Sequence, residues 1–63
     1  MSRGDDNLVT IDYDEIVTDT DDAILIRVGL EDIWIPRSQI SNHDEVANEM
    51  DIPEWLALNE GLI

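Results

Sequence analysis

The segment DYDEIVTDTDD holds the side chains that could do chemistry, because six of its eleven residues are carboxylates. They are Asp12, Asp14, Glu15, Asp19, Asp21 and Asp22, and no lysine, arginine or histidine lies among them. Such a cluster could bind a metal ion, could form a solvated surface without a specific role, or could bind a positively charged partner.

Of these three possible roles, metal binding can be tested against a defined sequence pattern. Carboxylate oxygens are the ligands that Ca²⁺ prefers, so the pattern to test is that of a calcium-binding loop. The EF-hand loop has the pattern D-x-[DN]-x-[DN]-G, followed by a distal glutamate. Residues 19–24, DTDDAI, begin this pattern but place Ala23 where an oxygen ligand belongs and Ile24 where glycine must turn. We therefore expect no metal site; a weak, nonspecific cation cluster at Asp19, Asp21 and Asp22 is the alternative.

Residues suited to catalysis are scarce. His43 is the one histidine, and we expect it at the surface; Ser2, Ser38 and Ser41 have no evident base partner. There is no cysteine, and the three glycines form no phosphate-binding loop. We expect a protein that is not an enzyme and binds no cofactor.

The charge of the whole chain is strongly negative. Sixteen acidic residues stand against three arginines and no lysine, which gives a net charge of −13. Direct binding of nucleic acid requires cations that face the phosphates, so we expect none. The expected partner is a basic protein surface, bound by the six carboxylates above and by a second set: Asp44, Glu45 and Glu49.

A chain of 63 residues forms one domain at most, and such a domain buries only about 60% of the surface that its unfolded form exposes. Its hydrophobic content of 43% is nevertheless too high for an acidic disordered tail. No apolar run approaches the roughly 18 residues of a membrane span, and the start MSRGDDN lacks the apolar core of a signal peptide. We expect a soluble, cytoplasmic protein that does not bind membranes.

The elements that must position the carboxylates are clearest at AILIRVGLEDIWIP, which predicts a β-hairpin rich in β-branched residues. A two-residue loop at Gly29 and Leu30 suits a type II′ turn, which takes glycine first; a four-residue loop is the alternative. We expect Trp34 to pack on Leu25 and the C-terminal segment, with an exposed interface anchor as the alternative. The two-residue loop predicts these cross-strand pairs: Val28–Glu31, Arg27–Asp32, Ile26–Ile33, Leu25–Trp34 and Ile24–Ile35.

The flanking segments supply further elements. NLVTIDYDEIVT predicts a first strand with Val9, Ile11 and Tyr13 on one face and a bend near residues 14–15. RSQISN predicts a turn that returns Ile40 to the core. Residues 44–52 fit either a helix or a loop, and we favour a loop that leads into a short strand at 49–52.

The segment IPEWLALNEGLI predicts a brief C-terminal helix. Pro53 suits the first helical position, Glu54 suits the positive N-terminal end, and Gly61 suits a left-handed C-cap. Two turns are not stable in isolation, so we expect the helix to dock on the sheet, with Trp55 and Leu58 on its buried face and Trp55 over the isoleucines. The predicted fold is α+β: residues 8–63 form a small antiparallel sheet of three or four strands with one short C-terminal helix, after a flexible N-terminus at 1–7.

Carboxylates on such a sheet would form a regular array of negative charge. Side chains on one face recur about every 6.6 Å along a strand, and neighbouring strands lie about 4.8 Å apart. DNA presents a phosphate about every 3.4 Å of axis per strand. A groove lined by arginine and lysine could accept either polyanion, which suggests nucleic-acid mimicry.

Two motifs resemble those of small proteins encoded by bacterial phages and mobile elements. In those proteins a hairpin ends in W-[IL]-P-[KR]-S-x-[IV], and a tail with P-x-W-[LF]-A…G-L follows. The resemblance covers roughly residues 20–63; the chain departs from it at the turn, where residues 29–30 replace the commoner Asp-Gly, and in a tail without the usual lysines. The matching residues are Trp34, Pro36, Arg37, Ser38 and Ile40, then Pro53, Trp55, Leu56, Ala57, Gly61 and Leu62.

Small acidic phage proteins include many anti-CRISPR and anti-restriction inhibitors, several of which resemble DNA in charge. The resemblance therefore implies a non-enzymatic inhibitor that occupies the DNA-binding surface of a host defence complex, with a subunit of a CRISPR effector as the favoured partner. The alternatives are adaptation to molar salt, or an acidic interaction module or homodimer that hides Trp34 and an edge strand. A halophilic protein should fold better in molar salt, whereas a mimic should fold at ordinary ionic strength and lose its partner as salt rises.

Overall fold

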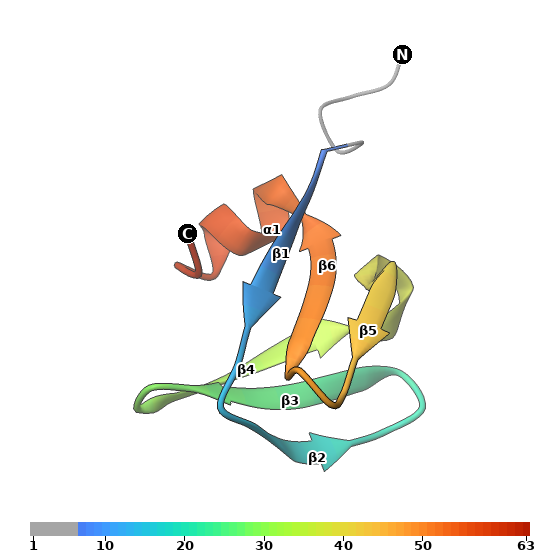
Figure 1. Ribbon diagram of the computed structural model, residues 1–63, viewed down its shortest axis with the longest axis vertical. Helices are drawn as coiled ribbons and strands as arrows, with labels where there is room; N and C mark the ends of the chain where they lie inside the picture. Colours follow the sequence, from blue (N-terminus) through green and yellow to red (C-terminus); the bar gives the residue numbers. More distant parts are fainter. Residues whose placement is uncertain (1–6) are drawn as a thin grey trace.

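The computed structural model describes residues 7–63, which form two three-stranded antiparallel sheets and one short α-helix (Figure 1). Sheet A has the strand order β1-β6-β5, and sheet B has the order β2-β3-β4. The fold class is therefore α+β, as predicted. The elements are β1 (Leu8–Asp12), β2 (Glu15–Asp19), β3 (Ala23–Val28), β4 (Glu31–Pro36), the 3₁₀ helix η2 (Arg37–Gln39), β5 (Asn42–Asp44), β6 (Glu49–Pro53) and α1 (Glu54–Asn59).

The hairpin of β3 and β4 has the predicted register. All five predicted cross-strand pairs are present, and Ala23 with Pro36 adds a sixth. Gly29 has a φ of 64° and Leu30 has a negative φ, which is the combination that a type II′ turn requires. The two-residue loop is therefore confirmed.

The predicted alternation is present, because Ile11 of β1 and Tyr13, which follows the strand, are each only 4% exposed. The chain then bends at residues 13–14, as expected, and β2 pairs with β3 in the other sheet. One continuous segment thus supplies an edge strand to each sheet. In Figure 1 this corner joins the two sheets, and the strands of sheet B run across the direction of the strands of sheet A.

Each sheet has three antiparallel strands, within the predicted three or four, but the prediction of a single sheet is wrong because there are two. β6 does not pair with the hairpin. It pairs with β1 on one side and with β5 on the other. β5, with the sequence NHD, is too short and too polar to show an alternating pattern. It forms a strand because β6 offers it a second set of backbone hydrogen-bonding groups.

The core lies between the two sheets. The hairpin isoleucines fill it from sheet B, and Met50 and Ile52 fill it from sheet A. Ile40, which follows η2, packs against its edge as predicted. The buried apolar residues are Ile11, Tyr13, Ile24, Ile26, Ile33, Ile35, Met50, Ile52, Leu56 and Ala57.

The predicted buried face of the helix is wrong. Trp55 is 47% exposed and Leu58 is 59% exposed, whereas Leu56 and Ala57 are buried at 4% and 0%. The helix follows β6 without a loop, and Pro53 is its N-cap rather than its first residue. The strand therefore sets the rotation of the helix, and the apolar spacing of the helix alone cannot reveal it.

The C-terminal end of α1 has the predicted glycine cap. Gly61 has a φ of 74°. The N–H of Leu62 donates to the carbonyl of Ala57 at 2.8 Å, and the N–H of Gly61 donates to the carbonyl of Leu58 at 3.1 Å. These two bonds define a Schellman motif, which places Leu62 against the core.

Of the N-terminal segment predicted to be flexible, residues 1–6 lie outside the described residues. The carbonyl of Asn7 accepts a hydrogen bond from the N–H of Glu54 at 2.9 Å. Within residues 7–63, no helix has the length and apolar character needed to cross a membrane.

Candidate acidic interaction surface

Three carboxylates from three strands lie in one row across the outer face of sheet A. Asp12 of β1 pairs with Glu49 of β6, and Glu49 pairs with Asp44 of β5. All three are exposed and alternate with inward residues such as Ile11 and Met50, so their side chains point to solvent. Directly opposite residues of neighbouring strands have Cβ atoms about 4.5–5.5 Å apart, so Glu49 lies close to both Asp12 and Asp44. We call these three residues the acidic row.

Asp51 adds a fourth carboxylate to the same face. Its oxygens accept hydrogen bonds from Thr10 Oγ1 at 2.5 Å and from Asn42 Nδ2 at 3.0 Å. The bond from Thr10, and then that from Asn42, lower the pKa of Asp51 below its ordinary value of 3.8. Asp51 is not among the predicted residues, although its i+2 spacing from Glu49 on a predicted strand places both on one face.

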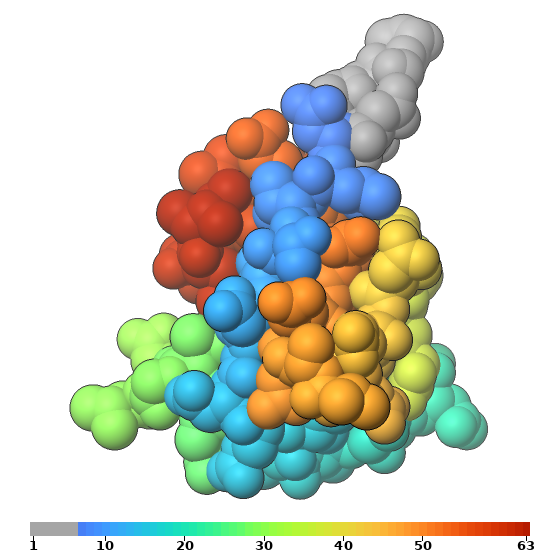
Figure 2. All heavy atoms as spheres, viewed as in Figure 1, coloured from blue at the N-terminus to red at the C-terminus, as the bar shows by residue number. Residues whose placement is uncertain are grey.

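The outer face of sheet A lacks cationic side chains. Its three strands contain no arginine, and the chain contains no lysine. None of the ion pairs within residues 7–63 involves the acidic row. A shallow depression of about 370 Å³ is lined by residues of all three strands, including Asp44, Glu49 and Asp51. In Figure 2 these strands, in blue, orange and yellow, cover much of the face turned to the viewer.

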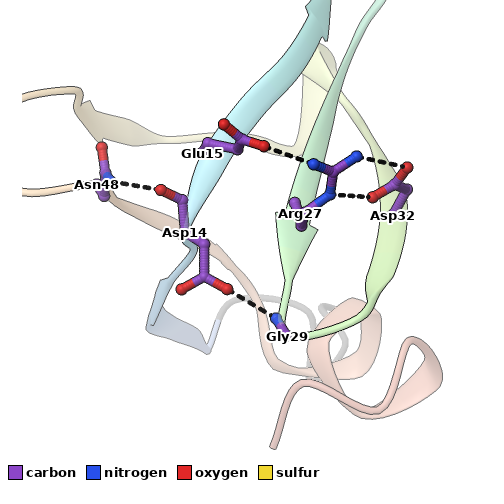
Figure 3. A network of polar contacts seen from close by, with 6 residues as sticks. All are labelled: Asp14, Glu15, Arg27, Gly29, Asp32 and Asn48. Atoms are coloured by element: carbon purple, nitrogen blue, oxygen red, sulfur yellow. Dashed lines mark hydrogen bonds and ion pairs between the residues drawn. The ribbon is translucent and has the colours of Figure 1, made fainter.

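Asp14 holds the corner between β1 and β2 rather than joining the acidic row (Figure 3). Its carboxylate accepts a hydrogen bond from the N–H of Gly29 at 2.8 Å. Its backbone carbonyl accepts one from Asn48 Nδ2 at 3.1 Å, and the carbonyl of Asn48 accepts the N–H of Tyr13 at 3.0 Å. The predicted site residue Asp14 therefore has a structural role.

Glu15 belongs to an ion-pair network on the outer face of sheet B, also drawn in Figure 3. Its Oε2 lies 2.6 Å from a terminal nitrogen of Arg27, and Nε of Arg27 donates to Asp32 at 2.9 Å. The hydrogen bond with Asp32, and then the charges of Asp32 and Glu15, raise the pKa of Arg27. Both carboxylates therefore already have a cationic partner in the free protein.

Asp19, Asp21 and Asp22 lie at the other end of β2 from Glu15, in and beside the turn to β3. Asp19 forms an ion pair with Arg37, and Nε of Arg37 donates to a backbone carbonyl in this turn at 2.6 Å. Asp19 therefore already has a cationic partner in the free protein, as Glu15 has.

Asp44 has a second role beside its place in the acidic row. Its Oδ1 accepts the N–H groups of Val46 and Ala47, each at 3.1 Å, and so caps the turn between β5 and β6. Glu45 lies exposed in that turn. The second predicted set thus contributes Asp44 and Glu49 to the row, with Glu45 at its margin.

A tyrosine–histidine pair lies beneath this end of sheet A. The hydroxyl of Tyr13 is 2.7 Å from Nε2 of His43, which is half-buried rather than at the surface as expected. Burial, and then the charges of Glu45 and Asp44, raise the pKa of Tyr13 above its ordinary value of 10.0. The pair therefore links β5 to the corner that follows β1.

The residues of the two sequence motifs mostly have structural roles. Arg37 anchors the turn before β3, Leu56 and Ala57 are buried, and Gly61 caps the helix. The two tryptophans differ from these buried residues, because Trp34 keeps 49% and Trp55 keeps 47% of its surface exposed. Trp34 lies opposite Leu25 as predicted, but its exposure fits the alternative of an exposed side chain better than the expected packing.

Residues 7–63 contain no group of three or more histidine, aspartate or glutamate side chains arranged to hold a metal ion. No protein-family model, curated protein or solved structure matches the chain. The function must therefore be inferred from the surface itself.

Proposed function

We propose that the protein is a non-enzymatic inhibitor that inserts its acidic row into the basic, nucleic-acid-binding groove of a cytoplasmic host defence protein. A subunit of a CRISPR effector is the partner that we favour. One observation carries the proposal: three carboxylates from different strands lie side by side on a face where residues 7–63 supply no cation.

The physical argument is that the row is unfavourable in the free protein. Like charges directly opposite each other destabilise a sheet, and this fold retains two such contacts at Glu49. Arginine and lysine side chains of a partner would relieve the repulsion. The strand spacing of about 4.8 Å is of the same order as the spacing of DNA phosphates along the axis. Association should therefore be fast and sensitive to salt.

A pair of triple variants with equal charge tests the proposal. The first neutralises the acidic row by Asp12→Asn, Asp44→Asn and Glu49→Gln. The control neutralises three carboxylates elsewhere by Glu31→Gln, Glu54→Gln and Glu60→Gln. The immobilised protein is used to recover nucleic-acid-binding proteins from a bacterial lysate, and the recovered proteins are then tested for displacement of duplex DNA.

The row variant should bind roughly tenfold more weakly, because each exposed ion pair contributes about 0–1 kcal/mol. The control should bind like the parent. Equal losses in the two variants would show that net charge alone matters, and the assignment to the acidic row would then be wrong.

Circular dichroism at low and molar salt addresses adaptation to a saline habitat. The proposal expects a folded protein at about 0.15 M salt, where exposed charges are screened beyond about 8 Å. A protein that folds only in molar salt would contradict the proposal, because its charge would then serve solubility.

A further inference from the structure

Strand β4 is an open sheet edge. The order β2-β3-β4 leaves no strand on its far side, and it pairs with β3 without a shift in register over six residues. Native proteins protect edges with bulges, short strands, covering elements, charged side chains or proline. β4 has charged residues at its start and Pro36 at its end, but it has no bulge and no strand beside it. The other edges have such protection: β2 has a register shift between Ile16 and Thr18, β5 has three residues, and α1 packs against β1.

The hydrogen-bonding groups on this edge can be assigned from the turn. Val28 and Glu31 close a two-residue loop, so alternate residues of β4 from Glu31 onward bond to β3. The backbone N–H and C=O groups of Asp32 and Trp34 therefore point away from β3. The carbonyl of Arg27, opposite Asp32, accepts from the N–H of Asp14 at 2.7 Å on the β2 side, as this alternation requires. β4 thus offers two donors and two acceptors to another strand.

The charges on the same side of the molecule indicate which strand could add there. The outer face of sheet B has Leu25 and Trp34 at its centre. Ion pairs of Arg27 lie on one side of them, and the Arg37 pair lies on the other. The two arginines of residues 7–63 both lie on this face and partly neutralise its carboxylates, whereas the strands of sheet A carry carboxylates and no arginine. Two copies with a net charge of −13 each repel, and they can approach with least repulsion at β4.

We infer that two copies of this chain associate through β4, as antiparallel edge strands with Asp32 of each opposite Trp34 of the other. This register uses the outward N–H and C=O groups of both residues in both copies, and it covers part of each exposed Trp34 side chain. The acidic row belongs to sheet A and not to the β4 interface, so the dimer would expose two acidic rows, one from each copy. Two linked rows would bind an extended basic surface more tightly than one.

Sedimentation equilibrium tests the dimer at protein concentrations up to about 1 mM, the dissociation constant of a very weak complex. Salt is set at about 0.1 M and about 1 M, where the Debye lengths are about 10 Å and 3 Å. The dimer fraction should rise with protein concentration and with salt, because salt screens the repulsion between copies. A monomer at both salt concentrations overturns the inference.

Two variants locate the interface. Trp34→Glu should abolish the dimer, because it places a carboxylate directly opposite Asp32 of the other copy. Trp55→Glu makes the same chemical change at a tryptophan that is 47% exposed, and it should leave the dimer intact. A dimer that persists in Trp34→Glu, or that is lost in Trp55→Glu, places the interface elsewhere.

Amide hydrogen exchange of the parent protein gives a test that needs no variant. The N–H groups of Asp32 and Trp34 should exchange several-fold more slowly when the protein concentration is raised into the dimer range. Exchange rates at these two amides that do not change with concentration contradict the inference.

Discussion

The outer faces of the two sheets contain the same three-residue arrangement with opposite charge at its centre. On sheet B, Glu15, Arg27 and Asp32 follow one another across β2, β3 and β4. On sheet A, the acidic row crosses β1, β6 and β5 in the same way, with Glu49 in the place of the arginine. The carboxylates on sheet B therefore share a cation of the same chain, whereas the acidic row has no ion pair among residues 7–63.

The comparison separates charge that supports the fold from charge that does not. The carboxylates beside arginines hold strands together and carry ion pairs at 2.6–2.9 Å. The acidic row makes no such contact among residues 7–63, and its like charges oppose the pairing of β1 and β5 with β6. A small domain has little stability to spare, which is why we assign the row a role in binding.

The largest expected effect tests whether the two faces belong to one cooperative unit. Ile26 of sheet B and Ile52 of sheet A are both fully buried in the shared core. Ile26→Ala and Ile52→Ala should each lower the free energy of unfolding by about 2–5 kcal/mol. Urea denaturation measures the loss, and Ile→Val at the same positions, at about 0.5–1.5 kcal/mol, serves if alanine prevents folding. A variant that unfolds one sheet alone would contradict a shared core.

Reversing the charge at the central residue of each row, Glu49 or Arg27, should change the stability of the protein in opposite directions. Glu49→Arg replaces two like-charge contacts by two opposite-charge contacts and should stabilise the protein by roughly 0.5–2 kcal/mol. Arg27→Glu should destabilise it, because both ion pairs of sheet B become repulsive. Thermal unfolding of the two variants measures the signs, and shifts in the same direction would show that the two rows are not equivalent.

The pKa of Tyr13 responds to its burial and to the charges of Glu45 and Asp44 at the end of the acidic row. Because the pKa of Tyr13 is raised, its contribution to stability is complete below pH 10.0 and is lost as the pH rises above that value through the pKa of the folded state. Glu45→Gln should lower the pKa of Tyr13. The chain has one tyrosine, so absorbance of the tyrosinate gives the titration directly. Glu15→Gln on sheet B is the control and should leave the titration unchanged.

The smallest expected effect concerns Asp51, whose carboxylate accepts hydrogen bonds from two side chains of sheet A. Its pKa is lowered in the folded protein, so its contribution is present above pH 3.8 and is lost as the pH falls below that value. Thr10→Val removes the larger of its two hydrogen bonds and should weaken this acid dependence. Urea midpoints between about pH 5 and pH 2.5 measure it; an unchanged slope would mean that the bond from Thr10 does not set the pKa.

The local elements were predictable where one short segment decides the structure. The hairpin register follows from glycine at the first turn position, and the cap of α1 follows from Gly61. The buried face of α1 was not predictable, because β6 and its direct junction at Pro53 set the rotation of the helix. The second sheet was missed because β5 owes its existence to β6 and has no apolar pattern of its own.

The acidic residues were predictable as individual candidates but not as a surface. Asp12 and Glu49 meet only because β1 pairs with β6, far apart in sequence. Strand pairing also places Glu15 beside Arg27, and the hairpin end places Asp19 beside Arg37. Composition reveals an excess of negative charge, whereas strand order decides which charges remain available.

The pairing of β1 with β6, which sets Leu8 opposite Pro53, also constrains the order in which the molecule can form. The β3–β4 hairpin closes through neighbouring residues, so it can form first. Sheet A should form later, since closing the long loop between β1 and β6 carries an entropic cost that only the complete core repays. Until β6 pairs with β1, the isoleucines of the hairpin are uncovered, and we expect the folding chain to be most prone to aggregation at that stage.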